Sequence, residues 1–222
     1  LSSFSKTLSS ATGDTIDKSE AVINEIVVRA RELAQLKTEL EEYKRLAVTD
    51  PITKLSNRRA FDQRLAAIYD DPKNTMHHAL LVADIDHFKM FNDTYGHQVG
   101  DRVLSVAAAM MKNSLDKDAF VARTGGEEFA VIMKGTSLEA ALEAAERMRR
   151  AIEATQLKNH NEGVDCGSIT MSMGLCMSSD ALSAEDLYRN ADRALYEANN
   201  AGPAQAEIYT PKLKRALAFL KR

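Results

Sequence analysis

The sequence predicts an α/β domain with one central sheet, preceded by a long helix. Three observations carry this prediction. Residues 15–47 contain neither glycine nor proline and place apolar residues at helical spacing. After Pro51, apolar runs of strand length alternate with amphipathic stretches of helix length, a pattern typical of helices that cover a sheet. Finally, 222 residues with 45% hydrophobic composition are enough for one full-sized core and an appendage.

Composition excludes several classes of protein. The charge is nearly balanced, with 29 Lys and Arg against 32 Asp and Glu, which argues against a nucleic-acid partner held by a basic surface. The longest apolar runs fall far short of the ~18 residues of a membrane span, so we expect no span in this fragment. Cys166 and Cys176 have no metal-ligand spacing around them, and we expect small core thiols in a reducing compartment.

The first 47 residues predict a helical stalk. Residues 1–14 are rich in Ser and Thr and contain Gly13, so we expect weak or frayed structure there. Further on, apolar residues recur at the three- and four-residue steps of a heptad seam: Ile26, Leu33, Leu36, Leu40, Tyr43 and Ala47. Arg29 interrupts this seam, and an earlier frame through Ile23 and Ala30 also fits. We expect a long helix that pairs in a dimeric coiled coil, and the alternative is a helix that folds back on its own domain.

The first half of the domain, residues 48–210, opens where Pro51 ends the helix, because proline cannot continue one. A helix is expected at 57–69, capped by Ser56 or Asn57. The continuous apolar run at 79–84 predicts a buried strand that ends in an acidic residue. The pattern then predicts a polar loop at 92–101, a helix at 101–113, and strands at 120–123 and 129–133 joined as a hairpin.

The second half continues the alternation. The apolar patterns predict a helix at 137–155, a strand at 169–176, a helix at 184–200 and a short edge strand at 206–209. The tail, residues 211–222, is basic and amphipathic, and we expect a short packing helix, with membrane contact as the alternative. The chain has neither an initiating Met nor a signal-peptide pattern, so we expect it to be a piece of a longer protein.

Two acidic residues close the predicted buried strand. A carboxylate such as Asp84 is costly there unless a cation or hydrogen-bond donors satisfy it. Asp86 lies two residues further on and points to the same face while the strand continues. The polar loop that follows contains two glycines and feeds into a helix, where backbone N–H groups bind phosphates well. Lys89 lies close by and can neutralise phosphate charge.

The hairpin at 124–128 is a second acidic site. Its two glycines allow a close approach of the backbone to a ligand. The adjacent carboxylates of Glu127 and Glu128 repel each other, and a divalent cation would relieve that repulsion. Together with Asp84 they offer hard oxygen ligands suited to Mg²⁺ or Mn²⁺. Each motif by itself is also explained by an ordinary turn or a solvated charge, but together, in this order, they predict metal-assisted phosphoryl transfer on a nucleotide.

These motifs make the sequence resemble the GGDEF family of diguanylate cyclases, with the signature variant Gly-Gly-Glu-Glu-Phe at 125–129. The match covers about residues 49–209. It includes segments 49–50, 57–61, 84–89, 92–93, 96–97, 100–101, 125–129, 170–174 and 191–196. The resemblance implies a palm-like α+β fold of the nucleotidyl-cyclase type, with a central, mostly antiparallel sheet flanked by helices.

The resemblance also implies the catalytic and metal-binding residues. Asp84, Glu127 and the backbone carbonyl of Ile85 would hold Mg²⁺ or Mn²⁺. Glu127 would also be the base for the 3′-hydroxyl of GTP, with Glu128 beside it among the catalytic residues. Lys89 would stabilise the charge on the transferring phosphoryl group.

The substrate-binding residues follow from the same resemblance. Backbone amides around His87 and Phe88 would cradle phosphate. Asn92 and Asp101 would read the guanine edge, with His97 nearby. A carboxylate at Asp101 can accept hydrogen bonds from guanine N1–H and the exocyclic amine, which adenine cannot reciprocate.

The family reaction condenses two GTP molecules into cyclic di-GMP and two pyrophosphates. Because each domain holds one GTP, two domains must face each other, and a homodimer through the N-terminal helix would raise the local concentration of the second half-site and gate activity. The resemblance further implies an upstream sensor domain absent from this chain and a bacterial cytoplasmic location. The alternative is a catalytically weak or silent domain that binds GTP or acts through protein contacts.

The chain departs from the family pattern at three places. Asn199 and Pro203 stand where the family has a Lys and an Arg that touch the terminal phosphates, which predicts weakened GTP binding. Asp116 and Ala119 replace the Arg-x-x-Asp pair of the family's product-inhibition site, so we expect no feedback through that site. Lys54 replaces the glycine of an early turn.

Overall fold

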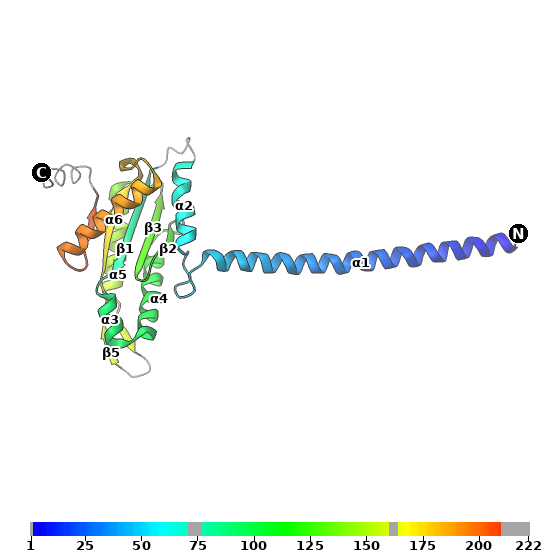
Figure 1. Cartoon of the computed structure of the whole chain (residues 1–222), viewed down its shortest axis with the longest axis horizontal. Coiled ribbons are helices and arrows are strands. Elements are labelled where there is room, and N and C mark those ends of the chain that lie inside the picture. Colours follow the sequence, from blue (N-terminus) through cyan, green and yellow to red (C-terminus); the bar gives the residue numbers. More distant parts are fainter. Residues whose placement is uncertain (1, 71–76, 160–163, 210–222) are drawn as a thin grey trace. The chain divides into compact units, whose positions relative to one another are not determined.

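The computed structural model describes the backbone of residues 2–70, 77–159 and 164–209, and the side chains of residues 25–70, 77–157 and 166–209. The chain divides into two compact units, Leu1–Ala47 and Val48–Arg222 (Figure 1). The tail helix predicted at 211–222 lies outside the described residues. No helix in the described part of the chain is long and apolar enough to cross a membrane.

The first unit consists of helix α1 (Ser2–Val48). The predicted long helix is therefore confirmed, and it includes residues 2–14, where the composition predicted weak or frayed structure. A single glycine such as Gly13 costs a helix only about 1 kcal/mol, and no proline interrupts the stretch. The apolar seam of α1 is exposed in the single chain, with Leu33 67% and Tyr43 70% accessible. Ion pairs between neighbouring turns, such as Arg29–Glu25, run along the same helix.

The second unit is built on a five-stranded sheet with strand order β2-β3-β1-β6-β7. Neighbouring strands are antiparallel, except that β6 and β7 are parallel, which confirms the predicted mostly antiparallel sheet. The sheet strands are β1 (His78–Ile85), β2 (Phe120–Arg123), β3 (Glu128–Lys134), β6 (Met171–Met177) and β7 (Ala206–Ile208). The helices are α2 (Arg58–Asp70), α3 (Phe88–Tyr95), α4 (His97–Ser114), α5 (Leu138–Glu153), a short 3₁₀ turn η1 (Ser178–Asp180) and α6 (Ala184–Ala201).

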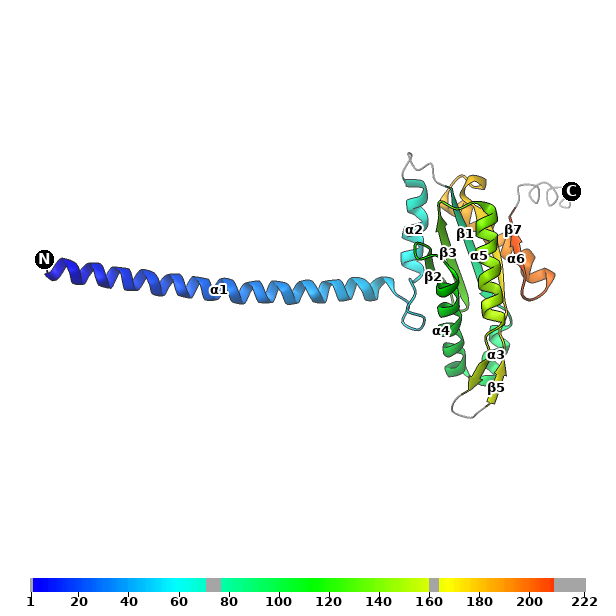
Figure 2. The same ribbon diagram turned by 180° about the vertical axis from the view of Figure 1, so that it is seen from behind.

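Helices cover both faces of the sheet. Because side chains alternate along a strand, Leu81 and Ala83 of β1 pack on one face with α4 and α5. Leu80 and Val82 pack on the other face with α2 and α6. α6 lies in front of the sheet in Figure 1, and α5 lies in front in the reverse view of Figure 2. The central strand is thus buried on both sides, which explains its uninterrupted apolar sequence.

Local details both confirm and correct the predicted elements. Asn57 caps α2, since its Oδ1 accepts a hydrogen bond from the Ala60 N–H at 3.1 Å. The polar loop predicted at 92–101 is wrong. There α3 and α4 follow each other, separated by Gly96 at φ 85°, a conformation that glycine adopts without strain. A two-stranded hairpin, β4 (Leu157–Asn159) with β5 (Val164–Gly167), is an addition that apolar periodicity did not reveal.

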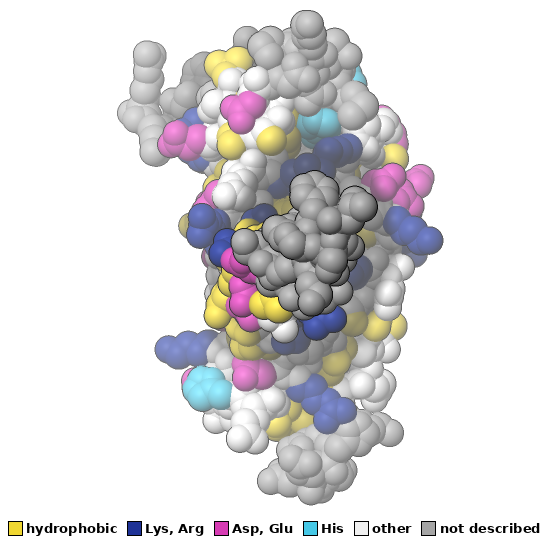
Figure 3. All heavy atoms as spheres, turned by 90° about the vertical axis from the view of Figure 1, so that its right-hand side faces the viewer, with side chains coloured by type: hydrophobic (Ala, Val, Ile, Leu, Met, Phe, Trp, Pro, Cys, Tyr) yellow, Lys and Arg dark blue, Asp and Glu magenta, His cyan; other side chains and the backbone are white. Residues whose placement is uncertain are grey.

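The cysteines and the surface agree with the composition. Cys166 and Cys176 are buried, as predicted for small core thiols. On the face drawn in Figure 3, basic and acidic side chains are interspersed with apolar and neutral ones. This mixing accords with the near-neutral charge of the chain.

Candidate active site

Carboxylates from two separate segments meet where β1 ends. Antiparallel pairing of β1 with β3 places Asp84 opposite Glu128. One residue further, the Ile85 N–H lies 3.4 Å from the Glu127 carbonyl oxygen. Asp84 and Glu127 are 43 positions apart in the chain, yet the sheet brings them to adjacent places.

The electrostatics of this group favour a cation. Burial, and after it the charges of Glu127, Glu128 and Asp86, together raise the pKa of Asp84 to about 7. Burial and the neighbouring Glu128 also raise the pKa of Glu127. Negative charge is therefore concentrated here beyond what the surrounding protein neutralises.

The arginine of the hairpin does not neutralise these carboxylates. Arg123 forms a largely buried ion pair with Asp50, with Nη1 3.2 Å from Oδ2. Its Nη2 also donates to the Gly126 carbonyl at 2.7 Å. Arg123 thus ties the turn after α1 to the signature hairpin, and its charge is shared with Asp50.

The Asp86 carboxylate connects the end of β1 to two other segments beside the site. Its carboxylate accepts hydrogen bonds from Thr170 Oγ1 at 2.6 Å, from Ser172 Oγ at 2.7 Å and from the Ala204 N–H at 2.9 Å. These bonds fasten the segment after α6 to the end of β1. The sequence places Asp86 on the same face as Asp84 but does not reveal this role, because its partners lie more than 80 residues away.

A cavity of about 230 Å³ opens beside the carboxylates. It is lined by Asp84, Asp86, His87, Asn199 and Pro203. Asn199 and Pro203, which together form the first of the three departures from the family pattern, therefore border the same space as Asp84 and Asp86. The wall that α6 and the following segment contribute carries no basic side chain at these two positions.

The start of α3 adds backbone donors. His87 precedes the helix in a left-handed conformation, at φ 58°. The Phe88 side chain is core, 5% exposed, so only its backbone N–H could serve a ligand. The first N–H groups of a helix have no intrahelical acceptor, which leaves those of Phe88 and Lys89 available. The Lys89 side chain is exposed.

The predicted guanine-reading residues lie on α3 and α4. Asn92 is half-buried, and its Oδ1 is a buried acceptor without a hydrogen-bond donor among the described residues. His97 and Asp101 are exposed on the first turns of α4. Within the described residues, no hydrogen bond or ion pair joins these three to the carboxylates. The structure thus groups the predicted site residues into an acidic cluster at the β1 end and a polar set on α3 and α4.

The third departure, Lys54, lies in the turn after α1. Lys54 adopts φ 59°, a conformation in which glycine is unstrained and other residues are not. Its N–H donates to the Asp50 carbonyl at 3.0 Å. The same turn uses the Asp50 carboxylate, which accepts from the Thr53 N–H at 2.7 Å. Burial opposes ionisation of Asp50, but the bonds from Thr53 and Arg123 outweigh it and lower its pKa.

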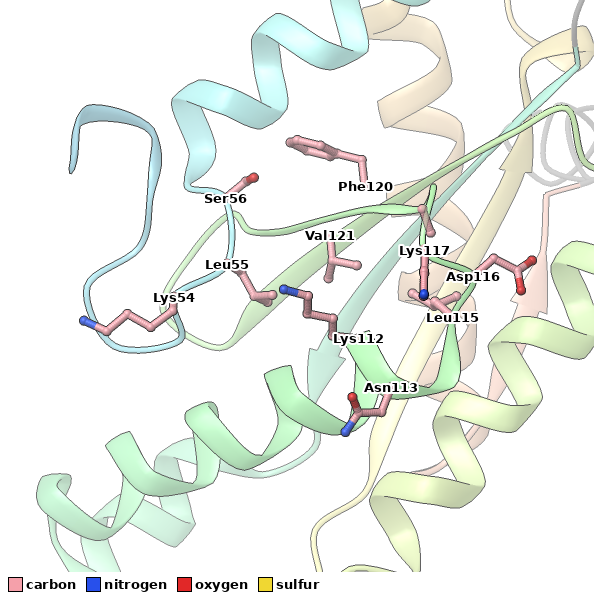
Figure 4. Close-up of a pocket in the computed structure, with 11 residues that line it drawn as sticks. Lys54, Leu55, Ser56, Lys112, Asn113, Leu115, Asp116, Lys117, Phe120 and Val121 are labelled. Carbon is pink, nitrogen blue, oxygen red and sulfur yellow. The ribbon is translucent and has the colours of Figure 1, made fainter. Parts of the chain in front are cut away.

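The residues at the product-inhibition positions border a second cavity, of about 600 Å³. Figure 4 shows the Asp116 carboxylate and the Lys112 ammonium pointing to opposite sides of it. Ala119 has no polar side chain to offer. The pair of opposite charges that the family uses is thus absent at these two positions.

The chain matches the family model "Diguanylate cyclase, GGDEF domain" over residues 47–205. It is 40% identical over 173 residues to the diguanylate cyclase DgcP of Pseudomonas aeruginosa, covering 76% of this chain and 25% of that protein. It is 38% identical over 180 residues to the diguanylate cyclase VdcA of Vibrio cholerae, covering 81% of this chain and 52% of that protein. The chain therefore spans between a quarter and about half of the length of these curated relatives.

The chain is also similar to solved structures of GGDEF domains. The coiled coil and GGDEF domain of DgcB from Caulobacter crescentus, in complex with c-di-GMP, matches with a TM-score of 0.80 at 32% identity, covering 84% of this chain and 98% of that one. The active GGEEF domain of a diguanylate cyclase from Vibrio cholerae matches with a TM-score of 0.63 at 30% identity, covering 70% and 98%.

Proposed function

The chain belongs to the GGDEF domain family, and from that premise we propose that it is a diguanylate cyclase, which condenses two GTP molecules into cyclic di-GMP with release of two pyrophosphates. The observation that carries this proposal is the meeting of Asp84 with the signature glutamates at the end of β1. The cavity beside them would take the phosphates of GTP. Residues 48–210 would form the catalytic domain and residues 1–47 the stalk, in the bacterial cytoplasm and downstream of a sensor domain.

The acidic cluster fits Mg²⁺ or Mn²⁺. Asp84 and Glu127 would supply carboxylate oxygens, and the Ile85 carbonyl would supply a third hard ligand from the backbone next to Asp84. Within the described residues, no group of three or more His, Cys, Asp or Glu side chains could hold a metal ion by itself. Mg²⁺ does not need such a cage, because it keeps several waters and binds through one or two carboxylates together with substrate phosphates. The raised pKa of Asp84 is the electrostatic reason for a cation here.

Glu127 is the proposed base. The 3′-oxygen of one GTP attacks the α-phosphorus of the other, and the bond from that phosphorus to the bridging oxygen of pyrophosphate breaks. The proton of the 3′-hydroxyl passes to the Glu127 carboxylate, whose basicity is increased by burial and by Glu128. Repeating the step on the second pair of groups closes the ring. A bound divalent ion would supply charge neutralisation at the phosphates.

The phosphates would be held mainly by α3. The N–H groups of Phe88 and Lys89 at the start of this helix are suited to phosphate oxygens. The Lys89 ammonium would stabilise the charge of the transferring phosphoryl group. Asn199 and Pro203 border the cavity without charge, so we expect a lower GTP affinity than in relatives that have the usual Lys and Arg.

Guanine would be read by Asn92 and Asp101, with His97 nearby. The exposed Asp101 carboxylate would accept from guanine N1–H and from the exocyclic amine. Adenine presents no donor at N1, so we expect a preference for GTP over ATP. The substitution Asp101→Ser should relax that preference, and unaltered rejection of ATP would exclude this role.

Two such domains would meet through α1. The exposed seam, with Leu33, Leu36 and Leu40 at least half accessible, is the surface a second copy would cover. Leu36→Glu should make the rate per protomer fall steeply on dilution, since each half-site would have to find its partner. Ala34→Glu adds the same charge outside the seam and should not change the rate. Equal behaviour of the two variants on dilution would argue against dimerisation through α1.

The decisive experiment is to incubate the purified chain with GTP and MgCl₂ and to detect products by liquid chromatography and mass spectrometry. We expect cyclic di-GMP and pyrophosphate. Glu127→Gln should lower turnover at least about a hundredfold, the scale of a lost general base. Glu143→Gln, an exposed carboxamide substitution on α5, should leave turnover unchanged. Consumption of GTP without any cyclic dinucleotide would refute the proposed activity.

A further inference from the structure

The Asn92 side chain lies against the backbone of Gly100. A Cβ atom at residue 100 would lie 1.8 Å from Asn92 Oδ1, 2.9 Å from its Cγ and 3.3 Å from Phe88 Cζ. Real Cβ atoms essentially never come within 3.0 Å of such neighbours. The observed position of the Asn92 carboxamide therefore requires that residue 100 have no side chain.

The backbone gives no other reason for glycine at this position. Gly100 lies inside α4 and does not have the positive φ that makes glycine necessary at Gly96. In a helix interior alanine is more favourable than glycine. The glycine thus lowers the stability of α4 and provides space for Asn92.

The two ends of the Asn92 carboxamide have different surroundings. Oδ1 is buried and has no hydrogen-bond donor among the described residues. Its contact with the Gly100 backbone can give at most a weak C–H···O interaction. Nδ2 is not among the buried unpartnered atoms, and no described residue accepts from it, so this nitrogen is accessible to solvent. A buried polar atom without a partner is unusual in a folded protein and calls for an explanation.

We infer that Gly100 is a positioning residue that locks the Asn92 carboxamide with its oxygen inward and its amide nitrogen outward, where it donates to the O6 atom of a guanine base. This rests on the proposed function, because it assumes a guanine nucleotide at the site. Adenine carries an amino group in place of O6, and two donors would then face each other. Asp101 accepts from the donors of the same base edge, so donors and acceptors on the protein complement guanine at each point.

The substitution Gly100→Ala tests this positioning. The atom that must move is the end of the flexible Asn92 side chain, so the fold should survive, with a thermal midpoint at or above that of the wild type. Binding is measured by calorimetry with the α,β-methylene analogues of GTP and ATP in MgCl₂, which cannot undergo the condensation. We expect Gly100→Ala to lower the affinity for the GTP analogue about fivefold, the scale of one lost hydrogen bond. The ratio of the affinities for the GTP and ATP analogues should decrease as well.

Two further variants separate positioning from general disturbance. Asn92→Ala should weaken the GTP analogue as much as Gly100→Ala does, and the double variant should lose no more than Asn92→Ala alone. Gln98→Ala, an exposed change in the same turn of α4, should bind like the wild type. Wild-type affinity in Gly100→Ala, or additive losses in the double variant, would overturn the inference.

A nucleotide-free measurement distinguishes this inference from the proposed function. The side-chain amide resonances of Asn92 in a ¹⁵N correlation spectrum should shift in Gly100→Ala and not in Gln98→Ala. Unshifted resonances would overturn the positioning even if the wild type binds the GTP analogue. If the wild type binds neither analogue, the proposed function is overturned, and so is the contact with guanine. The spectra would still decide whether Gly100 positions Asn92.

Discussion

Restoring a cation at position 199 should strengthen nucleotide binding. Asn199 is exposed near the end of α6 and lines the cavity of about 230 Å³ that also contains Asp84 and Asp86. A charge-assisted hydrogen bond contributes about 1.5–3 kcal/mol, which is roughly ten- to a hundredfold in affinity. Solvent screening at an exposed position, and competition from the two carboxylates for the new ammonium, reduce this gain. We therefore expect Asn199→Lys to lower the dissociation constant of GTP by about tenfold, the bottom of that range.

The assay is calorimetric titration with the α,β-methylene analogue of GTP, so that condensation does not deplete the ligand. Asn200→Lys is the matched control, because it adds the same charge one residue along, at an exposed position that does not line the cavity. It should change affinity less than about twofold, the scale of a screened surface charge. GMP, which lacks the terminal phosphates, should bind both variants like the wild type. An equal gain in affinity for the GTP analogue in both variants, or an equal gain in affinity for GMP, would refute the proposal that residue 199 lies beside the terminal phosphates.

Three further predictions concern stability. Lys54→Gly should raise the free energy of unfolding in urea by about 1 kcal/mol, because it relieves the left-handed conformation, whereas Lys54→Ala, which keeps the Cβ, should not; equal values would contradict this. Because the pKa of Asp84 is raised to about 7 in the folded state, the metal-free protein loses stability as pH rises from about 4 to about 7. Asp84→Asn should therefore be more stable than the wild type at about pH 8, by at most about 4 kcal/mol. Below about pH 4 the two proteins should be equally stable. MgCl₂ should reduce this difference in stability. Equal urea midpoints for wild type and Asp84→Asn at about pH 8 would disprove the predicted effect of Asp84 ionisation. Asp86→Ala should lower the unfolding free energy by about 2 kcal/mol or more, since three donors lose a charged acceptor, and an unchanged midpoint would show that the Ala204 segment is held otherwise.

Local sequence was sufficient for most of the sheet and for its acidic end. The run from Ala79 to Ala83 is apolar at every position, as a strand covered on both faces must be, and the structure buries it there. The hairpin that carries Glu127 was equally evident, because two apolar strands flank a pair of glycines. Periodicity failed for α3, where eight residues hold only two turns and no long apolar pattern can develop.

The seam of α1, the buried central strand and the acidic signature follow from the order of residues alone, because each depends on neighbours within a few positions. Tertiary structure was needed to show that Asp86 fastens the Ala204 segment and that Asn199 shares a cavity with Asp84. It was also needed to place Gly100 beneath Asn92. These relations join residues on different elements, and their distances depend on how helices pack against one sheet, which no short stretch of sequence specifies.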